Sequence, residues 1–260
     1  MNAAPKTLRH LSELGESGLV ASDKRAALEK VAAQYAIAIT PAMSKLIDRA
    51  DPADPIARQF VPDPAELAVQ PEERADPIGD HAHSPVDGIV HRYPDRVLLK
   101  LTHVCAVYCR FCFRREMIGP SAEPLTAKQL DAALDYITAN PAIWEVVLTG
   151  GDPLVLSARR LKQVVSRLAA IAHVKIIRVH TRMPVADPGR ITGELVRALK
   201  AKGKATYVVL HANHARELTD AAREACARFI DAGIPMLSQS VLLAGVNDDP
   251  QTLGDRKSVV

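Results

Sequence analysis

Short apolar runs alternate with amphipathic segments through the second half of the chain. The runs that suit buried strands cover residues 97–102, 145–149, 175–181, 206–211 and 235–243. Between them, apolar positions at helical spacing predict helices over 126–139, 157–171, 191–202 and 219–232. Thr126 and Gln129 form a capping-box signature at the start of the first helix. This alternation, with a period of roughly thirty residues, is typical of repeated βαβ units on a parallel sheet.

The first ninety residues follow a different pattern. A stripe that includes Leu28, Val31, Tyr35 and Ile39 predicts a helix over 22–39. Seven prolines then occur between positions 52 and 85, among many acidic residues, which predicts an extended connector with one short helix at most. This connector is either a plain linker or a cap laid over a catalytic face, because loops serve both purposes.

Polar residues follow nearly every predicted strand. Gly150, Gly151 and Asp152 come after the second strand, His180 to Arg182 end the third, and His211 ends the fourth. An open doubly wound sheet gathers its site at one switch point, whereas a barrel brings all strand ends together. We therefore expect a partial (βα) TIM-like barrel over 91–249. A helical, proline-rich extension (1–90) precedes it, and an unpatterned tail (250–260) follows.

Composition and charge exclude several classes of protein. The 260 residues are 48% hydrophobic and 24% charged, which is ordinary for a globular protein, and the net charge of +3 does not suggest a nucleic-acid binder. Met1–Val20 has no long apolar stretch, and no apolar run is long enough to span a bilayer. The expectation is a cytoplasmic protein that contacts neither membrane nor nucleic acid.

Three of the four cysteines lie within eight positions. Cys105, Cys109 and Cys112 form a C-x3-C-x2-C motif. Three thiolates on one loop can bind three irons of a [4Fe–4S] cube and leave the fourth iron open. A zinc site with His103 as fourth ligand is the alternative, and a disulfide is disfavoured in a reducing compartment. The spacing favours the iron–sulfur interpretation.

The cysteine motif after the first barrel strand resembles that of the radical S-adenosylmethionine superfamily. Further segments resemble lysine 2,3-aminomutase and its relatives: HSPVDGIVHRYPDRVLLKLTHVCAVYCRFCFRREMIG, LTGGDPL, VHTRMPV, HANH and SQSVLLAGVND. The resemblance runs from about Thr40 to Asp249. It implies a [4Fe–4S] cluster whose open iron binds S-adenosylmethionine, and cleavage of that cofactor to a 5′-deoxyadenosyl radical that abstracts a hydrogen.

The resemblance also implies roles for individual residues near the cofactor. Glycine has no Cβ, so Gly150 and Gly151 let the backbone approach a ligand closely, and Asp152 can accept from an ammonium group. In the family this turn receives the methionyl amino group of S-adenosylmethionine. His211 and Gln239 match positions that touch the same cofactor, although such residues are often only hydrogen-bonded core groups.

Arginines crowd the cysteine motif, and their planar fork suits carboxylates and phosphates. By resemblance, Arg114 would hold the substrate carboxylate, and Arg92 or Arg96 would help to hold pyridoxal 5′-phosphate. The family reaction converts L-lysine to β-lysine through a pyridoxal phosphate imine. It implies lysine as substrate, an electron donor such as flavodoxin or ferredoxin, and a homo-oligomer.

The match departs from the family pattern near the end of the chain. The family lysine that holds pyridoxal phosphate lies in a glycine-rich segment near the C-terminus. No residue here matches it, since only PQTLGDRKSVV follows Asp249. We expect a C-terminally truncated or frameshifted product, with RKSVV as out-of-frame sequence. Two alternatives remain: a relative that forms β-lysine for modification of a translation elongation factor, and a non-catalytic iron–sulfur protein.

Overall fold

The protein is a single sheet with helices on one face and a helical layer at one end. The computed structural model describes residues 6–115, 117–118 and 124–258. The sheet has six strands in the order β1-β2-β3-β4-β5-β6. Their bounds are β1 (Ile89–Tyr93), β2 (Arg96–Thr102), β3 (Glu145–Gly150), β4 (Ile176–Thr181), β5 (Ala205–His211) and β6 (Met236–Gln239). β1 pairs antiparallel with β2, and all other neighbours are parallel.

Strand order distinguishes the two architectures that the sequence left open. A doubly wound sheet reverses its order at a switch point, whereas these strands follow one another without reversal. β1 and β6 are not paired with each other, so the ring is not closed. The prediction of a partial barrel is therefore confirmed.

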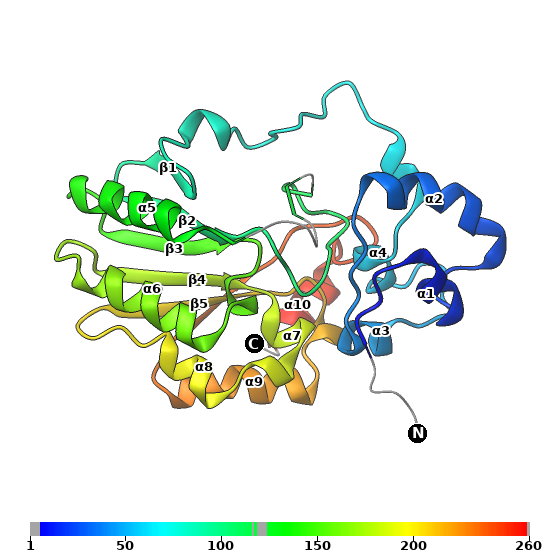
Figure 1. The fold of residues 1–260 in the computed structure, drawn as a ribbon. Helices are drawn as coiled ribbons and strands as arrows, with labels where there is room; N and C mark the ends of the chain where they lie inside the picture. Colours follow the sequence, from blue (N-terminus) through cyan, green and yellow to red (C-terminus); the bar gives the residue numbers. More distant parts are fainter. Residues whose placement is uncertain (1–5, 116, 119–123, 259–260) are drawn as a thin grey trace.

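Helices cover the outer face of the sheet (Figure 1). Alternate strand residues such as Leu99, Leu148, Ile177 and Val208 point to them and form one buried core. The helices that follow β2 are α5 (Ala127–Ala139), η4 (Pro153–Val155), α6 (Ala158–Ala170), α7 (Met183–Ala186), η5 (Pro188–Arg190), α8 (Gly193–Ala198), η6 (Ala215–Glu217), α9 (Asp220–Asp231) and α10 (Pro250–Ser258). The predicted Thr126–Gln129 capping box is present at the start of α5. Within the described residues, no helix has the length and apolar character needed to cross a membrane.

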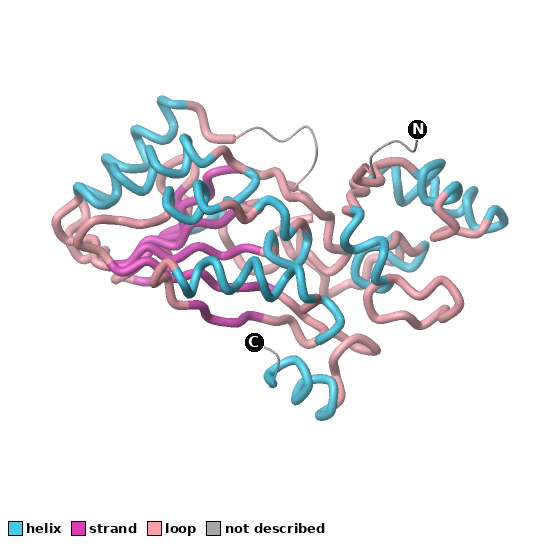
Figure 2. The backbone as a smooth tube through the Cα atoms, turned by 90° about the horizontal axis from the view of Figure 1, so that it is seen from below, coloured by secondary structure: helices cyan, strands magenta, loops and turns pink. Residues whose placement is uncertain are grey.

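The N-terminal region lies beyond the carboxyl ends of the strands, as Figures 1 and 2 show. It contains α1 (Leu11–Glu16), η1 (Ser22–Lys24), α2 (Arg25–Gln34), α3 (Pro41–Leu46), α4 (Ala57–Phe60), η2 (Pro64–Leu67) and η3 (His81–His83). Its buried residues, such as Ile39 and Phe60, share a second core with Tyr108 of the cysteine loop and Leu210 of β5. The region therefore covers the end of the sheet where barrel sites form.

Three predicted elements are clearly shorter than the sequence pattern indicated. The helix predicted over 191–202 covers only Gly193–Ala198. The helix predicted over 22–39 ends at Gln34, because Ile39 exchanges backbone hydrogen bonds with Leu8 and the Ala38 carbonyl accepts from Tyr108. The strand predicted over 235–243 ends at Gln239. Beyond it the chain turns away, since the Asn213 side chain accepts from the Val241 amide.

Several elements were missed, among them the last helix and the first strand. The tail over 250–260 was predicted to be unpatterned, but it forms α10, with the Asp249 carboxylate accepting from the Thr252 amide and Pro250 in the first turn. β1 was also absent from the prediction. It folds back on β2 through the turn between Tyr93 and Arg96, which pair with each other.

Candidate functional site

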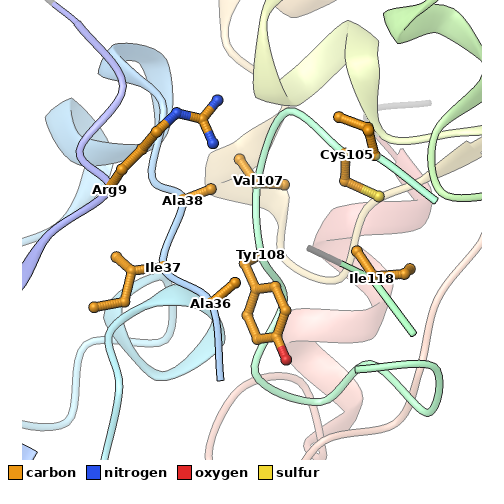
Figure 3. Close-up of a pocket in the computed structure, with 9 residues that line it drawn as sticks. Arg9, Ala36, Ile37, Ala38, Cys105, Val107, Tyr108 and Ile118 are labelled. Atoms are coloured by element: carbon orange, nitrogen blue, oxygen red, sulfur yellow. The ribbon is translucent and has the colours of Figure 1, made fainter. Parts of the chain in front are cut away.

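The cysteine loop leaves the carboxyl end of β2 and is fastened on both sides. On the sheet side, the Val104 carbonyl accepts from the Asp152 amide at 2.9 Å. On the N-terminal side, the Tyr108 amide donates to Ala38 and the Arg110 amide to Gln59, both at 2.9 Å. Figure 3 shows residues 36–38 beside Cys105, Val107 and Tyr108. The sheet and the N-terminal helical region therefore both contact this loop.

The three thiols lie partly buried and close enough to influence one another. Burial, followed by the Asp152 carboxylate and the other two thiols, raises the pKa of Cys105 well above its usual value. Burial also raises the pKa of Cys109 to about 11, although the charge of Arg182 opposes the shift. Such thiols resist ionisation alone, whereas a bound metal deprotonates a coordinating thiol outright.

Three thiols on one loop suit the three irons of a [4Fe–4S] cube. In the part of the chain that the structure describes, no three His, Cys, Asp or Glu side chains converge as a single metal ion would require. A zinc site would need such convergence of Cys105, Cys109, Cys112 and His103. A cube takes one thiolate on each of three irons, so its ligands stand apart.

The Gly150–Gly151 turn approaches protein backbone rather than open space. Gly150 has φ of +106°, and a Cβ there would lie 2.5 Å from the Thr102 carbonyl oxygen. A Cβ at Gly151 would lie 2.3 Å from the Val104 carbonyl oxygen. Only glycine allows β3 to lie this close to the root of the cysteine loop. The close approach predicted for a ligand is thus made, in this structure, by the cysteine loop itself.

The Asp152 carboxylate is hydrogen-bonded to other groups of the protein. Its carboxylate accepts from the Thr181 hydroxyl at 2.8 and 2.9 Å, from the Arg182 amide at 2.7 Å and from the Leu154 amide at 2.9 Å. These bonds tie the end of β3 to the end of β4. Protein donors therefore occupy both Asp152 oxygens, and the contact with a ligand ammonium stays a prediction.

His211 and Gln239 stand next to each other on the inner face, at the ends of β5 and β6. The Nε2 atom of His211 is buried and has no hydrogen-bond partner among the described residues. Burial lowers the pKa of His211 to about 4, so the ring is neutral at pH 7. Its ring also packs against Phe111 of the cysteine loop, with centroids 5.9 Å apart. The free Nε2 of this neutral imidazole, next to the cysteine loop, is suited to bind a ligand.

The three predicted anion-binding arginines separate into two places. Arg114 donates twice to Asp80, at 2.9 and 3.1 Å, and Arg92 lies 3.9 Å from the same carboxylate. Arg96 instead lies at the start of β2, where it pairs with Asp95 at 2.9 Å and Glu145 at 3.5 Å. β2 is seven residues long, so Arg96 stands roughly 20 Å from Thr102, at the other end of the strand, where the cysteine loop begins.

The acidic connector holds the cysteine loop through ion pairs. Arg110 binds Glu66 through three hydrogen bonds of 2.5–3.0 Å, and both side chains are almost fully buried. Arg115 lies 3.7 Å from the half-exposed Glu73. Together with the Arg114–Asp80 pair, these contacts fasten residues 66–80 over the loop. This placement favours the cap over the plain linker.

Three residues that lie at the site were assigned no role from the sequence. Arg182, which follows β4, donates to the Cys109 sulfur at 3.4 Å. His180 contacts the Gln239 side-chain oxygen through Nδ1 at 2.9 Å, and its Nε2 is buried without a partner among the described residues. Lys100 is buried on the inner face of β2, and burial lowers its pKa. A charged or polar residue inside an apolar strand was the available signal for Lys100 and His180.

Comparison with known proteins identifies the class to which this site belongs. The sequence profile of the Radical SAM superfamily matches residues 99–254, which include β2 and the three cysteines. The match covers more than half of the chain, so the protein is a member of the radical SAM superfamily. That class implies a [4Fe–4S] cluster and S-adenosylmethionine, in agreement with the three thiols of the loop.

Within the superfamily, the chain is similar to proteins named as 2,3-aminomutases. It is 46% identical over 212 residues to L-lysine 2,3-aminomutase of Acetoanaerobium sticklandii, a match that covers 82% of this chain and 51% of that protein. The corresponding enzyme of Clostridium subterminale is 44% identical, with the same coverage. Glutamate 2,3-aminomutase of Clostridioides difficile is 39% identical over 222 residues, covering 85% and 52%. The chain spans about half the length of these relatives.

Proposed function

We propose that the whole protein is an isomerase of the lysine 2,3-aminomutase type, which moves the amino group of L-lysine from C2 to C3. One observation carries the proposal: the loop that bears three thiols packs, through Phe111, against His211, whose buried Nε2 has no partner among the described residues, at the end of the sheet that the N-terminal region covers. Relatives named for lysine and for glutamate share the chain's sequence. The 46% identity to a lysine enzyme favours lysine.

The cysteine loop is the proposed cluster site. Cys105, Cys109 and Cys112 would each bind one iron, and the bound cluster with S-adenosylmethionine would supply the hydrogen-abstracting radical. The protein's own contribution is exclusion of water. Tyr108 and Phe60 are buried at 3% and 0% exposure where the N-terminal region meets the loop. Closure of this kind protects a reactive intermediate.

The seat for S-adenosylmethionine is proposed at the ends of β3, β5 and β6. His211 offers a buried ring nitrogen, and the His180 contact fixes the Gln239 side chain beside it. The backbone of the Gly150–Gly151 turn would face the methionyl amino group. Asp152 would support this turn by its bonds to Thr181 and the Arg182 amide.

The anion sites are proposed around Asp80. Arg114 and Arg92 share that carboxylate, and the charges of Asp80 and Arg114 both act on Lys100. A substrate carboxylate would compete with Asp80 for Arg114. Arg92 or Arg96 would help to hold pyridoxal phosphate; Arg92 lies at Asp80, whereas Arg96 stands at the far end of β2. No lysine of this chain is assigned to hold pyridoxal phosphate. A flavodoxin or ferredoxin donor, a cytoplasmic location and a homo-oligomer belong to the same proposal.

The test measures 5′-deoxyadenosine formed from S-adenosylmethionine by the anaerobically reconstituted and reduced chain. We expect formation by wild type and none by Cys109→Ser, with Cys226→Ser as control because Cys226 lies on α9, outside the loop. Adding L-lysine or L-glutamate with pyridoxal phosphate shows which amino acid accelerates cleavage. Cleavage that neither amino acid changes would contradict the aminomutase assignment. The stereochemistry of any β-lysine distinguishes the relative that modifies an elongation factor.

A further inference from the structure

A buried arginine outside the cysteine motif contacts one of the three cysteines. Arg182 follows β4 directly, and its side chain is 6% exposed. Its Nη1 donates to the Cys109 sulfur at 3.4 Å. The guanidinium also lies over the rings of Phe60, at 4.8 Å, and Phe111, at 5.5 Å. The charge is therefore held next to the sulfur in surroundings that screen it weakly.

A compensating carboxylate holds the other side of the guanidinium. Arg182 Nη2 donates to Glu217 at 2.6 Å and to the Gln59 side-chain oxygen at 2.5 Å. Glu217 is fully buried and also accepts from the backbone amides of Asn213 and His214. These bonds fix the order of charges: carboxylate, guanidinium, sulfur. The cation lies nearer the sulfur than the carboxylate does.

We propose that Arg182 is a positioning residue that sets the reduction potential of the cluster, and that Glu217 limits its effect. The inference rests on the proposed cluster at Cys105, Cys109 and Cys112. Reduction adds one electron, and hence one negative charge, to the cluster. A cation and a hydrogen bond at a ligand sulfur stabilise the reduced form and raise the potential. A buried carboxylate nearby has the opposite effect.

The two partners of the ion pair therefore give opposite predictions. Arg182→Gln removes the cation and should lower the potential, whereas Glu217→Gln leaves the cation uncompensated and should raise it. We expect each change to alter the ratio of reduced to oxidised cluster about tenfold at a fixed solution potential, which is about 59 mV for a one-electron couple. The measurement is an anaerobic redox titration of the reconstituted chain with a low-potential reductant, followed by the spin signal of the reduced cluster.

A matched ion pair on the same sheet provides the control. Arg178 pairs with Glu145, which is 1% exposed, at the opposite end of β4. Glu145→Gln removes a buried carboxylate from an arginine, as Glu217→Gln does, and should leave the potential unchanged. A purely structural effect of Glu217→Gln would appear as loss of iron or of helical circular dichroism without a shift in potential.

The possible results distinguish failure of the role of Arg182 from failure of the proposed cluster site. Opposite shifts in Arg182→Gln and Glu217→Gln support the proposal, whereas unchanged potentials or shifts in one direction overturn it. If Arg182→Gln does not fold or hold iron, Glu217→Gln decides alone: a rise supports the proposal, and no change or a fall overturns it. A wild-type chain that holds no iron and sulfide overturns the cluster assignment and this inference together.

Discussion

Single buried polar residues determine the chemistry available at the end of the sheet. His211 is the clearest example, because burial lowers its pKa to about 4 while its Nε2 stays unpartnered among the described residues. Asp152 shows the opposite arrangement, since both of its oxygens are occupied by protein donors. One residue is therefore open to a ligand, and the other holds the backbone that surrounds the ligand.

The His211 environment predicts a pH dependence of stability. The unfolded chain binds a proton at His211 near pH 6.5, whereas the folded protein does so near pH 4. Between these values the unfolded state binds more protons, so stability falls as pH decreases. Urea unfolding at pH 7 and pH 4 should show that wild type loses roughly 2–3 kcal/mol more than His211→Gln. Equal losses in both proteins would show that His211 is not buried in its neutral form.

Replacement of Asp152 should loosen the link between β3 and β4. Asp152→Asn turns one accepting oxygen into a donor that faces protein donors, and we expect a loss of about 1–3 kcal/mol in the free energy of unfolding. Asp187→Asn provides the control, because Asp187 is exposed and makes no side-chain cap. Equal stability of the two variants would contradict the structural role given to Asp152.

At the scale of elements, the connector and the cysteine loop form one unit. The Arg110–Glu66 pair is buried, with 6% and 11% of the side chains exposed, whereas Glu73 in the Arg115 pair is 45% exposed. Burial decides which pair matters, because exposed ion pairs are screened by water and contribute little. The first pair should therefore hold the connector over the loop.

This difference predicts unequal effects of two matched substitutions. Glu66→Gln leaves the buried Arg110 uncompensated and should lower the free energy of unfolding by about 3 kcal/mol. It should also speed hydrogen exchange in residues 59–70. Glu73→Gln should change stability by less than about 1 kcal/mol. Similar hydrogen-exchange rates in the two variants would contradict the role given to the Arg110–Glu66 pair.

The sequence could predict the alternation of strands and helices and the cysteine loop, because strand–helix periodicity and cysteine spacing are local signals. The cap at Thr126 was equally local, and it is present. The Asp249–Pro250 cap of α10 was a readable signal that the polar composition obscured. By contrast, the partners Glu66, Asp80 and Gln59 lie far from Arg110, Arg114 and Arg182 in the chain. Only the folded arrangement brings such charges together.

At the scale of the whole molecule, the described sheet ends in a strand whose outer edge is unpaired. Among the described residues, β6 pairs only with β5, and the segment around it exposes Leu237 at 46% and Leu242 at 68%. An unpaired edge with apolar side chains is a template for association with another chain. The fold thus has a site covered by the N-terminal region at one end of the sheet, and an unpaired strand with exposed apolar side chains at one side.

The edge predicts self-association of this chain. Sedimentation velocity across a range of concentrations should show assemblies for wild type and a shift toward monomer for Leu242→Lys. Lys162→Met, on the solvent side of α6, provides a surface control. A monomeric wild type, or assemblies unaffected by Leu242→Lys, would contradict the prediction.

The central claim is that one loop holds a [4Fe–4S] cluster with an iron open to S-adenosylmethionine. The most direct measurement is the spin signal of the reduced, anaerobically reconstituted chain, recorded with and without S-adenosylmethionine, alongside iron and sulfide content. The account predicts a cluster signal that S-adenosylmethionine alters and that Cys109→Ser lacks. A chain that takes up no iron and sulfide, or a cluster signal that S-adenosylmethionine leaves unchanged, would contradict it.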